Sequence, residues 1–253
     1  MLRRQSVIVR VPCVVGVLAS LALTACGGGS IAPVATAPSS AASAPATATS
    51  PAPHAIVIDR PVAAASLSIP FEISGTARVP DGALVVSVSD ASGTLCEHEL
   101  NVAVGGAWRT TMAFAPPAAP GPVTIRAFSR SPRDGTEINV VTRTVQVTAD
   151  PPDIVIAEPR CAADLAAESA LRVSGTARVF EAALTVELRA STGAVVAQQH
   201  VTADAGGSAT GRWSAELDLA GIPAGRYDLV AYNISPRDGT PEHIFSIPVR
   251  ITV

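Results

Sequence analysis

The sequence contains no lysine: all 18 basic residues are arginines, and only 15% of the residues are charged. The first 25 residues hold three of the arginines and no acidic residue. The rest of the chain therefore has 15 arginines against 21 acidic residues, a net charge of −6. No basic stripe remains that could neutralise phosphates, so we expect no nucleic-acid partner.

Aromatic residues make up only 4% of the chain, and signatures of catalysis are also missing. There is no G-x-S-x-G elbow and no phosphate-cradling glycine loop, and the histidines are singly placed: His54, His98, His200 and His243. We therefore expect no enzyme and no cofactor. Alanine, valine, threonine, proline and glycine are abundant instead, which favours short strands and turns over helices.

Residues 1–25 have the three-part pattern of a signal peptide, with early arginines, an apolar run over residues 11–23 and small residues at the end. The stretch "LTAC", Leu23 to Cys26, resembles the lipobox of bacterial lipoproteins. That resemblance implies cleavage before Cys26 and lipidation of its new N-terminus, with palmitate among the acyl chains that anchor the protein in a membrane. The alternative is an ordinary secretory signal followed by an incidental Cys26.

Residues 26–53 consist almost wholly of glycine, alanine, proline, serine and threonine, with neither charge nor apolar periodicity. Such a segment cannot bury enough surface to offset its ordering entropy, so we expect a disordered tether. The protein would then be extracytoplasmic. Gly27, where an Asp would indicate retention at the inner membrane, points to the outer membrane if the host is Gram-negative.

A repeat organises the remainder of the chain. "SGTARV" occurs at Ser74 to Val79 and again at Ser174 to Val179, and "SPRDGT" occurs at Ser131 to Thr136 and again at Ser235 to Thr240. "IVIDRP" and "IVIAEP" match in the same order. These matches predict two tandem domains, residues 54–149 and 153–253, joined by a short proline-containing linker.

Each copy reads as short alternating strands separated by turn signals. This predicts an all-β chain with two tandem immunoglobulin-like β-sandwiches of about seven strands each. "AADLAAESA", Ala162 to Ala170, is compatible with one helical turn. Trp108 and Trp213 are expected in the two cores.

"VSGTARVFEAALTVELRASTGAVV" and the later "YDLVAYNISPRDGTPEHIFSIPVRITV" resemble the immunoglobulin-like domain of bacterial spore germination proteins. The second copy carries the family's F-E pair at Phe180 and Glu181, whereas the first copy has Pro80 and Asp81 there. The resemblance implies a non-catalytic, extracytoplasmic sandwich. It does not imply a role in germination.

The "SPRDGT" motif is interpreted as a strand-connecting turn, in which Asp134 and Asp238 bond their own backbone while Gly135 and Gly239 supply positive φ. The alternative is a ligand-binding loop that presents Arg133 and Arg237.

"CEHE", Cys96 to Glu99, invites a metal interpretation, but the second copy has "VAQQ" there and no further ligand motif accompanies it. We expect a solvated strand with Cys96 and His98 on one face, and no metal. Export permits a disulfide between Cys96 and Cys161, which sequence alone leaves open.

The leading functional hypothesis is a structural or protein-interaction module of the cell envelope, with an unidentified envelope protein as partner. The alternative is a module that binds cell-wall or surface polysaccharide. Carbohydrate sites often use exposed aromatic residues, and the tryptophans are expected in the cores. Phe128 and Tyr232 are then the chief remaining candidates.

Overall fold

The computed structural model of the protein describes residues 55–103, 105–166 and 170–252, all of which belong to one compact unit. The predicted signal peptide, Cys26 and the tether lie outside the described residues. Within those residues, no helix has the length and apolar character needed to cross a membrane.

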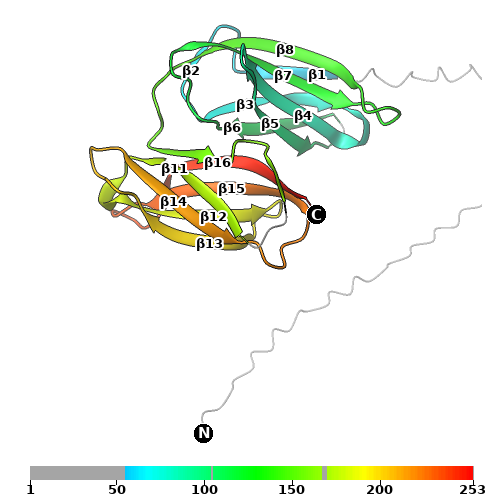
Figure 1. Ribbon diagram of the computed structural model, residues 1–253. Helices are drawn as coiled ribbons and strands as arrows, with labels where there is room; N and C mark the ends of the chain where they lie inside the picture. The colour runs from blue at the N-terminus through cyan, green and yellow to red at the C-terminus, as the bar shows by residue number, and fades with distance from the viewer. Residues whose placement is uncertain (1–54, 104, 167–169, 253) are drawn as a thin grey trace, which may run out of the picture. The chain divides into compact units, whose positions relative to one another are not determined.

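The first copy is a sandwich of a three-stranded and a five-stranded sheet, with strand orders β1-β3-β6 and β2-β8-β7-β4-β5 (Figure 1). Its strands are β1 (Ala55–Arg60), β2 (Ser66–Leu67), β3 (Phe71–Arg78), β4 (Ala83–Asp90), β5 (Gly93–Asn101), β6 (Gly106–Met112), β7 (Gly121–Arg130) and β8 (Glu137–Val147). All pairs are antiparallel except the short β2, which runs parallel to β8.

The second copy repeats this topology, with strand orders β9-β11-β14 and β10-β16-β15-β12-β13. Its strands are β9 (Ile154–Glu158), β10 (Asp164–Ala166), β11 (Ala170–Ala177), β12 (Ala183–Ala190), β13 (Val195–Thr202), β14 (Gly211–Asp218), β15 (Gly225–Ile234) and β16 (Pro241–Thr252). The predicted all-β fold with two tandem immunoglobulin-like sandwiches is confirmed. Each copy has seven main strands and one very short one.

The proposed helical turn within Ala162 to Ala170 is wrong at its centre, because Asp164–Ala166 form β10 and pair in parallel with β16. Alanine-rich sequence favours helix intrinsically, but here three residues complete the edge of an existing sheet. Tertiary pairing outweighs so weak a preference. Residues 167–169 lie outside the described residues.

The repeated "SGTARV" marks a close approach of three strands. A Cβ atom on Gly75 would lie 1.9 Å from the carbonyl oxygen of Val57 and 3.0 Å from the ring of Trp108, which faces Gly75 across the β3–β6 pair. The second copy repeats this contact at the equivalent residues, which are Gly175, Val155 and Trp213. Only glycine leaves room for both the neighbouring backbone and the indole, and both tryptophans are buried as predicted.

Candidate functional site

The first "SPRDGT" motif closes the β7–β8 hairpin through its own hydrogen bonds. The amide of Gly135 donates to the carbonyl of Ser131 at 2.9 Å, and the hydroxyl of Thr136 donates to Oδ1 of Asp134 at 2.8 Å. This hydroxyl is the main reason why the pKa of Asp134 lies below its usual value. Gly135 has φ of 72°, which favours glycine.

The second motif has the same geometry between β15 and β16. The amide of Gly239 donates to Ser235 at 2.9 Å, and Thr240 donates to Asp238 at 2.8 Å, which lowers the pKa of Asp238. Each aspartate therefore already accepts hydrogen bonds within its own turn. This is the geometry of a strand-connecting turn, in which the aspartates are exposed but hydrogen-bonded within the turn, and Arg133 and Arg237 are exposed beside them.

The copies diverge in sequence after "SGTARV", as "PDG" and "FEA", but their backbones agree. Both stretches form a 3-10 turn whose middle residue has positive φ, 53° at Asp81 and 56° at Glu181. Both are followed by the same backbone bond, in which Val102 donates to Gly82 and Ala203 donates to the corresponding alanine. The divergence therefore changes the presented side chains and preserves the backbone.

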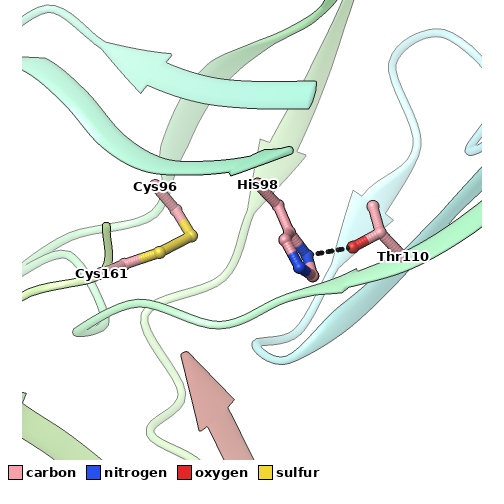
Figure 2. The surroundings of a disulfide bond; sticks show 4 residues. All are labelled: Cys96, His98, Thr110 and Cys161. Carbon is pink, nitrogen blue, oxygen red and sulfur yellow. Dashed lines mark hydrogen bonds between the residues drawn. A yellow bond between two sulfur atoms is a disulfide. The ribbon is translucent and has the colours of Figure 1, made fainter. Parts of the chain in front are cut away.

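Strand β5 joins the first sandwich to the second. Cys96 on β5 forms a disulfide with Cys161, which lies between β9 and β10, and their Cα atoms are 5.0 Å apart (Figure 2). Cys96 is almost fully buried. On the same strand, Glu99 forms an ion pair with Arg226 of β15, with 2.5 Å between Oε2 of Glu99 and Nη2 of Arg226.

The other residues of "CEHE" bond within the first sandwich. Figure 2 shows His98 beside the disulfide, where its Nδ1 lies 2.6 Å from the hydroxyl of Thr110 on β6. Glu97 pairs with Arg130 of β7 at 3.3 Å. Within the described residues, no group of three or more histidine, cysteine or acidic side chains is arranged to hold a metal ion.

Sheet register corrects the expected counterpart of "CEHE". Val88 pairs with Cys96 and the equivalent Leu188 pairs with Ala197, so the counterpart is "AQQH", Ala197 to His200, and not "VAQQ". One extra residue in the second copy's hairpin shifts the match by one position. A side-chain bond to the opposite sheet persists there, because Gln199 accepts from the backbone amide of Glu216 at 2.5 Å.

A polar cleft of about 500 Å³ lies beside this joint. The first copy lines it with β5 residues, including His98 and Glu99, and the second copy lines it with charged residues of β10, β15 and β16, which are Asp164, Arg226, Asp228 and Arg250. Burial lowers the pKa of His98 and raises the pKa of Asp228, because burial penalises the charged form of each.

Sequence reasoning missed the four charged residues that the second copy contributes to the cleft. Matching the sheet registers shows that their first-copy counterparts are all uncharged: Ser66, Pro122, Thr124 and Gln146. Aligning the copies residue by residue would have exposed this signal. These four charged residues therefore distinguish the cleft side of the second sandwich from the corresponding part of the first.

The expectation that Phe128 and Tyr232 are the exposed aromatics is wrong, since both are buried, at 1% and 8% exposure. Arg126 and Arg130 lie over the ring of Phe128, each with Cζ 5.4 Å from its centroid. Long arginine stems cover apolar surface on the outside of a sheet, which alternation of strand residues cannot reveal. Among the residues that the structure describes, Phe180 is the one exposed aromatic side chain, at 60%.

The family model for Gmad2, the immunoglobulin-like domain of bacterial spore germination, matches residues 55–136 and 153–240. The chain belongs to this family. One matched region lies in each sandwich, which confirms the predicted resemblance with two tandem copies. The turn of the second copy carries the family's Phe180 and Glu181. The equivalent turn of the first copy has the same backbone conformation but neither of these residues.

Solved structures with similar chains include a tetra-tandem repeat in the extending region of a large adhesion protein, with 18% identity, covering 79% of this chain and 50% of that chain, at a TM-score of 0.30. The BSP domain of a biofilm associated protein has 18% identity over 79% of this chain and 30% of that chain, at 0.24. The fibronectin(III)-like modules of Clostridium thermocellum CbhA have 15% identity over 78% of this chain and 93% of that chain, at 0.24.

The Gmad2 chain thus spans half or less of the first two proteins. No curated protein matches the chain. A Gmad2 chain with this sandwich fold is a structural or interaction module.

Proposed function

We propose that the protein is a lipid-anchored, extracytoplasmic interaction module of the bacterial cell envelope. The observation that carries this proposal is the disulfide between Cys96 and Cys161. Disulfides form and persist in oxidising compartments outside the cytoplasm, which agrees with the signal peptide pattern of residues 1–25. Of the four cysteines, Cys13 would be removed with the signal and Cys26 would carry the lipid.

Two properties of the sandwiches favour recognition of a protein over recognition of a polysaccharide. Among the described residues, all aromatic side chains except Phe180 are buried, which leaves a single exposed ring for stacking against sugars. The "SPRDGT" turns, for which a ligand-binding loop was the alternative interpretation, use their aspartates in hydrogen bonds within the turn. Sheet edges and apolar side chains on the surface remain available, and these are features that protein partners use.

The anchor is tested by labelling cells with radioactive palmitate and comparing the wild-type chain with Cys26→Ala. We expect label in the wild-type chain alone, and we expect globomycin to block maturation of the wild type. A matched Cys13→Ala variant should be processed and labelled normally, because residue 13 lies inside the signal. A soluble, unlabelled mature wild-type protein would refute the anchor.

The interaction role is tested separately by capturing partners of the full-length chain from detergent-solubilised envelope of the native host. We expect the chain to retain a specific envelope protein. In a parallel experiment, we expect the chain not to bind purified peptidoglycan. Binding to peptidoglycan without any protein partner would favour the polysaccharide-binding module instead.

A further inference from the structure

The edge strands of the two five-stranded sheets differ in charge and in what covers them. Strand β5 carries Glu97 and Glu99, and the second sandwich binds it through the disulfide and Arg226. Its counterpart β13 carries no arginine, aspartate or glutamate between Ser191 and Ala203, and its titratable side chain, His200, lies 3.0 Å from the hydroxyl of Thr185 on β12. Of the described edge strands, each of the others either bears a charge or, like β2, has only two residues.

An uncharged edge of this length is unusual, because proteins ordinarily protect exposed edges with charges, prolines or bulges. Strand β13 has a register shift only at its beginning, next to Val195. From Ala197 to Thr202 it pairs regularly with β12 through Ala183 to Leu188. Six consecutive residues with regular register therefore form the end of the sheet, where another strand can be added.

We propose that β13 pairs antiparallel with β13 of a second copy of this chain, so that two five-stranded sheets become one continuous sheet across a twofold axis. In such an isologous contact each strand meets itself, so a charge on the strand would face a like charge. Strand β13 is free of that repulsion, whereas Glu97 and Glu99 would oppose the same pairing at β5. The side chains of Val195 and Val196, which are 47% and 40% exposed, would gain cover at the ends of the paired strands.

This pairing goes beyond the proposed function, since it names the partner surface and does not depend on the lipid anchor. The contact of one strand pair is small, so we expect a weak, concentration-dependent dimer. The test uses two full-length chains with different affinity tags, co-expressed and purified in detergent through one tag. The second tag is then quantified in the eluate.

Charge-swapped variants identify the surface. The exposed residues Gln198 and Thr202 lie on the same face of β13 and are changed together, either to glutamate (Q198E/T202E) or to arginine (Q198R/T202R). We expect co-purification of either variant with itself to fall roughly tenfold, because like charges oppose each other across the pair. We expect the mixture of the glutamate chain with the arginine chain to recover the wild-type level.

Thr76→Glu is the matched control, because it adds a charge to an exposed position of β3, a central strand. It should leave co-purification unchanged, and circular dichroism should show equal melting for all variants. The proposal is overturned if wild-type chains do not co-purify, if the like-charged variants co-purify as well as wild type, or if the mixture fails to recover. Fractionation of the same cells reports on the anchor independently.

Discussion

The two sandwiches share strand order, glycine–tryptophan contacts and turns, and differ at the edges of their five-stranded sheets. In the first copy, β5 is bound by a disulfide and an ion pair to the second copy. In the second copy, β13 has neither partner among the described contacts. The difference teaches that duplication kept the scaffold constant while side chains at one edge became specific to the joint.

The cysteines of the joint differ between the copies while the local backbone is shared. Sheet register shows that Ala197 is the second copy's equivalent of Cys96. The match of "IVIDRP" with "IVIAEP" shows that Ala63 is the first copy's equivalent of Cys161. The backbone next to Cys161 is the same as that next to Ala63, since the following residues, Ala162 and Ala64, have φ of 61° and 60°. Each cysteine therefore occupies a site where the other copy folds with alanine.

Substitution of the shared glycine should have the largest effect and should be equal in the two copies. We expect Gly75→Ala and Gly175→Ala each to lower the free energy of unfolding by about 4 kcal/mol or more, because the new Cβ overlaps a backbone oxygen of the neighbouring strand. Chemical denaturation of the full-length chain measures this. Gly121→Ala is the control, since its Cβ would meet no atom within 4 Å. If only one of the two variants lost stability, the glycine contacts of the two copies would not be equivalent.

Removing the disulfide should separate the two copies thermodynamically. We expect Cys96→Ala combined with Cys161→Ala to cost about 2–4 kcal/mol, because the bond closes a loop between residues 65 apart. Alanine at the equivalent positions shows that neither local fold requires the thiol. Calorimetry should resolve two transitions in the variant where the wild type has one. An unchanged melting profile would show that the joint does not couple the sandwiches.

The two "SPRDGT" turns should respond alike to loss of their glycine. We expect Gly135→Val and Gly239→Val each to destabilise the chain by about 1–2 kcal/mol, since a β-branched residue is strained at positive φ. Thermal melting measures the effect, with Gly121→Val as a control at ordinary φ. If either substitution left the melting temperature unchanged but abolished partner capture, the turn would be a binding loop.

His98 should produce the smallest effect, a pH dependence that belongs to the first copy. Burial holds the pKa of His98 below 6.5 in the folded protein, so the unfolded chain binds the proton more readily as the pH falls. Its contribution to stability is therefore present above pH 6.5 and is lost as the pH falls from there through the folded pKa. We expect His98→Gln, which introduces the side chain found in the second copy, to flatten this slope.

The measurement is denaturant unfolding at a series of values between about pH 5 and pH 8. Asp228 acts in the opposite direction, because its raised pKa makes stability fall as the pH rises above 3.8. Repeating the series in an Asp228→Asn background separates the two groups. A slope that survives His98→Gln in both backgrounds would assign the pH dependence to other residues.

Sequence patterns predicted the fold because its determinants are local and repeated. Alternation along the strands, the glycine of "SGTARV" and the buried Trp108 and Trp213 are readable in either copy and are reinforced by the other. The "SPRDGT" turns also follow from the preferences of aspartate and glycine. These features depend on short-range backbone geometry, which residue type restricts strongly.

The candidate site was less accessible to sequence because it depends on distances between the copies. The approach of Cys96 to Cys161 and of Glu99 to Arg226 requires the arrangement of two domains, which no pattern within one domain encodes. Phe128 was misassigned for a related reason, since its cover comes from Arg126 and Arg130 on the same strand acting as apolar lids. The predicted lipidation of Cys26 stays a prediction.

The disulfide also determines how a pulling force would travel along the chain. The covalent path from one end to the other passes from Cys96 directly to Cys161, so the end of β5, the strands β6 to β9 and the linker are bypassed. A segment spanning 65 residues, whose extended length would be roughly 200 Å, cannot be drawn out while the bond is intact. Under tension, the two copies would therefore extend by very different amounts despite their common fold.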